Sequence, residues 1–329
     1  MRHWSFKKVL FSLVPMAVLF GGTELGLRAA GWPQPDGAFA HNEPFWVMDK
    51  DLDNESISHN EEDSSFSVTT DAHGLRVPVP AQDKRPGLYR IMTLGCSTTF
   101  GWGVNDDETY PAVLQDLIDK QGLESTEVIN GGQPGYSSFQ GVWFWERVLK
   151  HFEPDVVLIG YVVQDARKAA YTDLSQAILQ KDHRFLKDHV LYNSRSYVGL
   201  RSLLGSIQVK AKERESQDEG GVYRVPPAEY SANLRTLIEL VQEEGASPVL
   251  FGYPLEREGY TQGHRRIMQA AGEMIDVPYL NLQPDMETAS RTAELYFPRD
   301  RGHANAAGNR KIAHWVFNWL REHDLLGAS

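Results

Sequence analysis

The chain has 329 residues, of which 41% are hydrophobic, 11% aromatic and 23% charged, which excludes a disordered chain or a collagen-like repeat. With 33 basic and 44 acidic residues, the net charge is −11 and no basic face is visible, so we expect no nucleic-acid partner. The single cysteine, Cys96, excludes an intrachain disulfide and a zinc site built from several thiolates.

The first 31 residues predict a membrane anchor. Residues 9–23 carry no charge, and Arg2, Lys7 and Lys8 precede them. Because basic residues are retained on the cytoplasmic side, this order places the N-terminus inside and the rest of the chain outside the cytoplasmic membrane. The uncharged run is short for a spanning helix, which needs about 20 mostly apolar residues, and a cleaved signal peptide is the alternative. We predict an uncleaved signal anchor at residues 1–31.

From residue 86 onward, buried strands alternate with amphipathic helices. Strands are predicted at residues 89–95, 127–132, 155–163, 247–255 and 277–282. Helices are predicted at residues 109–122, 137–152, 227–245, 263–275 and 303–323. This order predicts an α/β protein, a three-layer α/β/α sandwich around a five-stranded parallel sheet of flavodoxin-like type. We expect one domain at residues 86–329 with an irregular insertion at 166–226, and an extension at residues 32–85 that packs on this domain.

Polar residues with chemical potential follow the carboxyl ends of the predicted strands. Ser97 follows the first strand, Gly135 lies in a glycine-rich turn after the second, and Gln164 follows the third. Asp300 and His303 lie in the loop after the fifth strand. Because the carboxyl ends of parallel strands meet at one edge of the sheet, we expect these residues around one cleft. A serine, a histidine, a carboxylate and several N–H donors are the groups that acyl transfer requires.

Four segments carry a family resemblance: GCSTTFGWGV, NGGQPGYSS, VVQDA and DRGH occur in the order of the four sequence blocks of the SGNH (GDSL-like) hydrolase superfamily. The chain resembles this superfamily from about residue 89 to its end, and its N-terminal segment resembles that of the membrane-anchored bacterial members. The resemblance implies that Ser97 is the nucleophile, His303 the base and Asp300 the carboxylate that orients the base. It also implies that the N–H groups of Ser97 and Gly135 bind the oxyanion.

The third segment departs from the family pattern Gly-x-Asn-Asp, because Val162 and Gln164 stand where the family has glycine and asparagine. Gln164 keeps the amide on a side chain that is one methylene longer. Two outcomes are open: Gln164 reaches the oxyanion as a third donor, or it points elsewhere and leaves Ser97 and Gly135 to act alone. We expect the first, because a buried amide without partners costs about 1–3 kcal/mol.

Each candidate residue also has a purely structural interpretation. Ser97 stands where a serine commonly caps a helix, and Asp300 and His303 could form a loop ion pair beside a helix cap. Gly135 follows a proline and is typical of a turn. We expect the Cys96 side chain in the core, because successive residues of a strand point to opposite faces. The sequence shows no histidine spacing for a metal and no dinucleotide or phosphate-loop motif, so we expect no metal and no cofactor.

Three functions fit these residues. The first is an exported serine esterase that hydrolyses an acyl ester of an envelope carbohydrate or lipid through Ser97, His303 and Asp300. The second is an acyltransferase that passes the acyl group to a sugar hydroxyl of a cell-surface polysaccharide. The third is a non-catalytic carbohydrate-binding module on the same fold. We predict the esterase, because the Asp-x-x-His pair follows the serine in the chain, whereas the related acetyltransferases often place an Asp-x-His motif before it.

Overall fold

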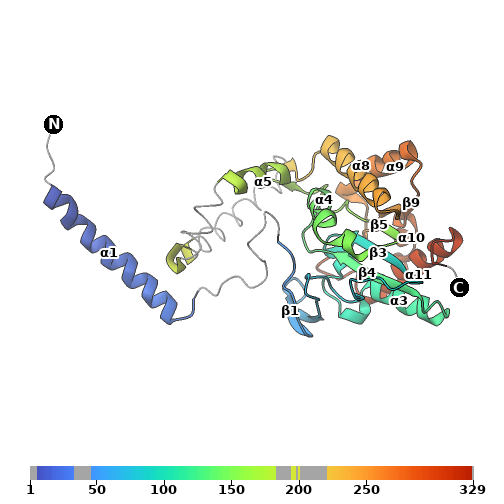
Figure 1. Ribbon diagram of the computed structural model, residues 1–329, viewed down its shortest axis with the longest axis horizontal. Helices are drawn as coiled ribbons and strands as arrows, with labels where there is room; N and C mark the ends of the chain where they lie inside the picture. The colour runs from blue at the N-terminus through green and yellow to red at the C-terminus, as the bar shows by residue number, and fades with distance from the viewer. Residues whose placement is uncertain (1–5, 33–45, 183–193, 198, 201–220, 328–329) are drawn as a thin grey trace. The chain divides into compact units, whose positions relative to one another are not determined.

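The computed structural model describes residues 6–32, 46–182, 194–197, 199–200 and 221–327 (Figure 1). The chain divides into two compact units. One contains residues 47–174 and 222–329, and the other contains residues 1–46 and 175–221.

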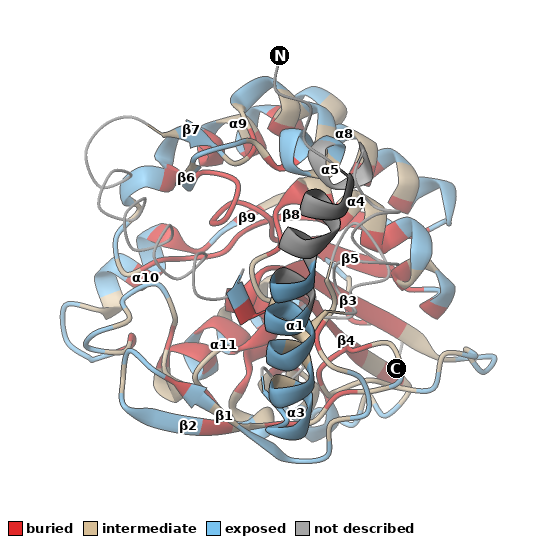
Figure 2. Cartoon of the chain, turned by 90° about the vertical axis from the view of Figure 1, so that its left-hand side faces the viewer, coloured by how far each residue is buried: buried red, intermediate tan, exposed pale blue. Residues whose placement is uncertain are grey.

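The larger unit is built on a five-stranded sheet with the strand order β4-β3-β5-β8-β9, in which all neighbouring strands pair in parallel. The strands are β3 (Tyr89–Gly95), β4 (Thr126–Gly132), β5 (Val156–Ile159), β8 (Ser247–Gly252) and β9 (Tyr279–Asn281). They are almost entirely buried, as Figure 2 shows. The predicted five-stranded parallel sheet is confirmed. Numbered one to five along the chain, these strands lie side by side in the order 2-1-3-4-5. The order changes direction between β3 and β5, and doubly wound folds bind their ligands at such a point.

Helices pack on both faces of this sheet. On one face, α3 (Tyr110–Lys120) contacts α11 (Ala306–Glu322), and both share a core with Ile91, Val128 and Val249 of the strands. On the other face, α8 (Pro227–Glu243) lies between α4 (Ser138–Arg147) and α9 (Gln262–Ile275). The shorter helices are α2 (Ser97–Phe100), η1 (Asp106–Glu108), η2 (Leu149–Phe152), η4 (Gly259–Thr261) and α10 (Gln283–Ala289).

Two predicted elements differ from the structure in a way that shapes the site. The strand expected at residues 155–163 ends at Ile159, and residues 162–167 form turns closed by the Val162 and Gln164 carbonyls. Both the strand and the turns are buried, so hydrophobicity alone does not separate them. The helix expected from residue 303 starts at Ala306, because the Asn305 side chain caps it through the Gly308 N–H at 3.0 Å. His303 therefore lies in a loop.

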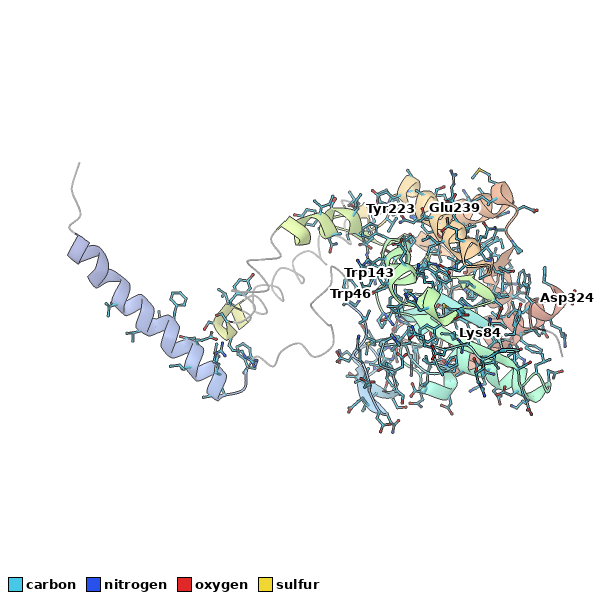
Figure 3. The ribbon with its side chains drawn as sticks, viewed as in Figure 1. Trp46, Lys84, Trp143, Tyr223, Glu239 and Asp324 are labelled. Atoms are coloured by element: carbon cyan, nitrogen blue, oxygen red, sulfur yellow. The ribbon has the colours of Figure 1, made fainter. Side chains whose placement is uncertain are left out.

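The extension forms a hairpin of β1 (Glu55–His59) and β2 (Ser64–Val68) beside the sheet domain. The buried side chain of Arg76 joins the hairpin to the sheet domain. It donates to the carbonyl of Ser67 in the hairpin and to those of Phe100 and Gly101 in the domain, at 2.6–3.0 Å. The Lys84 side chain, labelled in Figure 3, bonds Asp155 at 2.6 Å. A second small sheet pairs β6 (Lys168–Ala169) with β7 (Val222–Tyr223) at the two ends of the insertion.

The smaller unit includes α1 (Phe6–Ala29) and most of α5 (Asp173–Asp182). The backbone N–H groups of Ser196 and Arg195 bond the Glu24 carboxylate and lower its pKa to about 2.

The predicted membrane anchor is wrong, and the location in the cytoplasmic membrane that was predicted from it is wrong as well. Within the described residues, none of the helices has both the length and the apolar character that a membrane crossing requires. The reason lies in the charges of α1: Lys7 and Lys8 stand at one end, and Glu24 and Arg28 stand in its last turns. Only residues 9–23 are free of charge between them, fewer than the roughly 20 needed.

Candidate active site

Ser97 is presented by a tight turn at the carboxyl end of β3. The strand ends at Gly95, and Ser97 is the first residue of α2. A Cβ on Gly95 would lie 2.1 Å from Thr99 Oγ1, so the turn leaves room only for glycine. The N-cap position belongs to Cys96, whose backbone is extended, and the Ser97 hydroxyl makes its hydrogen bond elsewhere. Ser97 is therefore not the helix cap that its position suggested.

The Ser97 hydroxyl bonds His303, and His303 bonds Asp300. Ser97 Oγ lies 2.8 Å from His303 Nε2, and His303 Nδ1 lies 2.6 Å from Asp300 Oδ2. The carboxylate requires a proton on Nδ1, which leaves the Nε2 lone pair to accept the serine proton. These residues are distant in the sequence, since 206 positions separate Ser97 from His303. The fold thus brings together three predicted site residues in one hydrogen-bonded chain.

Asp300 lies in a polar environment that keeps its carboxylate ionised. Burial would raise its pKa, but hydrogen bonds and charge interactions with His303 and His59 outweigh this effect and lower it to about 2. The Gly302 N–H approaches its other oxygen, Oδ1, at 3.3 Å. The Asp300 carboxylate is therefore negative throughout the pH range in which a histidine titrates.

Gly135 lies in a turn at the carboxyl end of β4, the strand that pairs with β3. Pro134 and Gly135 occupy its central positions, and the Tyr136 N–H bonds the Gln133 carbonyl at 3.2 Å. The φ angle of Gly135 is +79°, which a type II turn requires at this position. The Gln133 N–H also bonds the Gly95 carbonyl at 3.0 Å, so the turn is joined to the strand that precedes Ser97.

Gln164 follows β5, the other neighbour of β3, and is nearly buried. Its side-chain oxygen accepts a hydrogen bond from Arg224 Nη1 at 2.8 Å. The same Arg224 nitrogen donates to the Gly135 carbonyl at 2.9 Å. Because the amide oxygen is engaged, the amide nitrogen points away from Arg224, and it bonds no group in the described part of the chain.

Arg224 is itself held firmly, although sequence reasoning did not find it. Its guanidinium makes a two-point ion pair with Asp173, from Nε and Nη2 at 2.9 Å each, and Nη2 also approaches Gln140 at 3.3 Å. Ser137 donates to the same Asp173 carboxylate at 2.6 Å. Arg224 follows Tyr223, which is labelled in Figure 3, in a stretch without helical or strand periodicity, so no local pattern marks it.

His59 is a second residue that sequence reasoning missed. It lies in the extension and bonds Asp300 Oδ2 at 2.9 Å. His59, Glu61 and Asp300 each place one possible metal-ligand atom within 4.8 Å of the others, and no other such group occurs among the described residues. Glu61 is exposed, and Asp300 Oδ2 already accepts bonds from two imidazoles, so the hydrogen bonds account for this cluster without an ion.

Cys96 is buried, as predicted. It is 1% exposed, and its sulfur lies 3.3 Å from the hydroxyl of Thr98. The thiol faces the interior while the neighbouring Ser97 hydroxyl faces His303. Cys96 therefore packs in the core and takes no part in the hydrogen-bonded chain.

At the carboxyl edge of the parallel sheet, a serine hydroxyl is bonded to an imidazole, and the imidazole is bonded to a carboxylate. Serine hydrolases have this arrangement. The model of the GDSL-like lipase/acylhydrolase family matches residues 93–311. The chain belongs to this family, whose members are serine hydrolases that act on ester bonds, and the resemblance seen in its sequence from about residue 89 onward is confirmed.

Solved structures that match this chain include three hydrolases. A lipase/acylhydrolase from Enterococcus faecalis is 16% identical, with 72% of this chain and 97% of the other covered and a TM-score of 0.49. An α/β hydrolase from the metagenome of Lake Arreo, Spain, is 16% identical, with 73% and 97% covered and a TM-score of 0.48. A variant of an acetyl xylan esterase from Geobacillus stearothermophilus is 17% identical, with 75% and 99% covered and a TM-score of 0.48. A search of curated proteins found no match.

Proposed function

We propose that the protein is an acylhydrolase that cleaves a carboxylic ester with Ser97 as nucleophile, His303 as general base and acid, and Asp300 as the group that orients His303. The observation that carries the proposal is the continuous hydrogen-bonded chain from Ser97 Oγ through His303 to Asp300 Oδ2, with bonds of 2.8 and 2.6 Å. Distances in this range are those expected of a nucleophile and base ready for proton transfer.

The reaction has two halves. In the first, Ser97 Oγ attacks the ester carbonyl carbon while His303 Nε2 takes the hydroxyl proton, and the intermediate collapses as His303 returns that proton to the departing alcohol. In the second, His303 takes a proton from water, the hydroxide attacks the acyl-serine, and the proton returns to Ser97 as the acid leaves. Asp300 keeps the Nδ1 proton in place and stabilises the imidazolium formed in each half.

The oxyanion of both tetrahedral intermediates binds three N–H donors in this proposal: the backbone groups of Ser97 and Gly135 and the amide of Gln164. The sheet order supports it, because β4 and β5 flank β3 and bring the residues after all three strands to one edge. The hydrogen bond from Arg224 supports the proposed role of Gln164 as a donor. By holding the amide oxygen, it leaves the amide nitrogen as the free donor and removes the freedom of the longer side chain.

In this proposal the catalytic domain and the extension have different roles. Residues 86–329 form the hydrolase domain, with an insertion at residues 166–226 that supplies Arg224. Residues 32–85 form the extension, which supplies His59. The bonds of Arg76 to the carbonyls of Phe100 and Gly101, at the end of α2, support this packing for residues 47–85, the part of the extension that lies in the larger unit.

The substrate class that we propose is an acyl ester carried by a carbohydrate or a lipid. A panel of p-nitrophenyl esters of increasing acyl length, acetylated polysaccharides and phospholipids, assayed by released acid, identifies the preferred acyl group and carrier. A fluorophosphonate probe should label the native protein and leave Ser97→Ala unlabelled. Labelling of the folded Ser97→Ala variant would refute Ser97 as the nucleophile, and acyl transfer to an added sugar in place of water would indicate a transferase.

A further inference from the structure

His59 is a buried histidine that contacts the proposed catalytic carboxylate from the extension. It is the last residue of β1 and is fully shielded from solvent. Its Nε2 lies 2.9 Å from Asp300 Oδ2, the oxygen that also bonds His303 Nδ1 at 2.6 Å. One carboxylate oxygen therefore accepts N–H bonds from two imidazoles, one of them 241 positions away in the sequence.

The two ring nitrogens of His59 lie in different surroundings. Nδ1 is buried and has no hydrogen-bond partner within the described residues. Nε2 faces Asp300 Oδ2, a carboxylate oxygen that can only accept, so Nε2 carries a proton and donates it to Asp300. His59 is thus a hydrogen-bond donor to the carboxylate.

The surroundings of His59 hold its ring in one orientation. Phe297 and Phe66 meet the ring edge to face, with centroids 4.8 and 6.3 Å away. Gly103 has a φ of +92°, and a Cβ there would lie 2.8 Å from His59 Nδ1 and 2.7 Å from the Phe297 ring. A side chain at position 103 would therefore displace the histidine, so the close packing depends on this glycine.

The extension also holds the backbone of Asp300. The Glu62 carboxylate, three residues beyond His59, accepts the N–H groups of Arg299 and Asp300 at 2.7 and 2.9 Å. Residues of one hairpin thus contact both the main chain and the side chain of Asp300. Both contacts limit how far the carboxylate can move relative to His303.

We propose that His59 is a positioning residue that holds Asp300 Oδ2 in the orientation from which it bonds His303 Nδ1. This inference rests on the proposed function of Ser97, His303 and Asp300. A carboxylate with one partner can rotate and present either oxygen, whereas a second donor on the same oxygen opposes that rotation. The imidazolium that Asp300 stabilises forms only during reaction, so the loss of this orientation lowers kcat and leaves KM nearly unchanged.

Two substitutions of His59 test the inference. His59→Leu removes the N–H donor at similar volume, and we expect kcat to fall about 10- to 100-fold. His59→Gln keeps an N–H donor and should recover part of that loss. His73→Leu is the matched control, because it removes a histidine–aspartate bond of the same 2.9 Å length, to Asp71 in the same extension, and should keep the native kcat.

A double-variant comparison separates positioning from a general structural role. If His59 acts through Asp300, adding His59→Leu to Asp300→Ala should cause no further loss of kcat. A further loss, or a native kcat in folded His59→Leu, overturns the inference. A native kcat in Asp300→Ala instead overturns the proposed function itself. If thermal unfolding shows that His59→Leu does not fold, His59→Asn replaces it with the same expected loss, because its shorter side chain does not reach Asp300.

Discussion

Gln164→Ala gives the sharpest test of the proposed oxyanion site, because this residue departs from the family pattern. The substitution removes the amide nitrogen that remains free when Arg224 holds the amide oxygen at 2.8 Å. Backbone donors at Ser97 and Gly135 are unaffected by the change. The experiment therefore removes one donor of three and leaves the nucleophile and base in place.

The expected loss follows from what one donor contributes. Removing a single oxyanion donor lowers kcat by about 10²- to 10³-fold. Gln164 is 8% exposed, so water can enter the space and partly replace the lost donor. We therefore expect the lower end, on the order of 10²-fold, which corresponds to about 2.7 kcal/mol of transition-state stabilisation. KM should change little, since the oxyanion exists only after attack.

Gln164→Glu is the matched variant. A carboxylate has nearly the same shape and still accepts the Arg224 bond, but it replaces the donor nitrogen with a negatively charged oxygen. At a pH where this carboxylate is ionised, we expect a larger loss of kcat than in Gln164→Ala. Gln242→Ala, an exposed change on α8, should keep the native rate.

The assay is steady-state hydrolysis of a p-nitrophenyl ester, with kcat and KM determined separately and the fold checked by circular dichroism. A native kcat in folded Gln164→Ala would remove Gln164 from the oxyanion site. A Gln164→Glu variant as active as the native protein would refute its role as a donor, because no donor nitrogen remains.

Four further outcomes are expected. Ser97→Ala should lower kcat by about 10⁴- to 10⁶-fold with an unchanged melting temperature, and an active folded variant would refute the nucleophile. Asp300, with a pKa of about 2, stays ionised above about pH 4, so its protonation should not add to the pH dependence of kcat/KM there: the slope of log(kcat/KM) against pH should not exceed about one, and a slope of two would show that a second group is protonated in this range. Cys96→Ser should retain most activity, and thiol alkylation of the native protein should not inhibit it, because the thiol is buried. Burial raises the pKa of Asp165 to about 6, above the pKa of 3.8 of an unfolded aspartate, so the native protein loses stability as the pH rises between these two values. The stability of Asp165→Asn relative to the native protein, measured by denaturant unfolding, should therefore increase from pH 4 to 7.

The sequence by itself determined the sheet and the three residues of the hydrogen-bonded chain. The strand at residues 89–95 was predicted with the bounds that the structure has, because its apolar run is short and ends at a glycine. Ser97, Asp300 and His303 were found because parallel strands bring their carboxyl ends to one edge of the sheet. The membrane anchor predicted from the basic start and the apolar run of the N-terminal segment was wrong, because α1 does not have the length and apolar character of a spanning helix.

Only the tertiary structure decided how these residues are held. The end of β5 at Ile159 and the start of α11 at Ala306 depend on turns and a cap that hydrophobic periodicity does not register. His59 ends a strand, and its partner Asp300 lies 241 positions away in the sequence. Arg224 lies in an irregular stretch, and its partner Gln164 lies 60 positions away. A hydrogen bond between such distant positions leaves no local pattern. It exists because the sheet and the extension bring the two side chains together, and that information belongs to the folded chain.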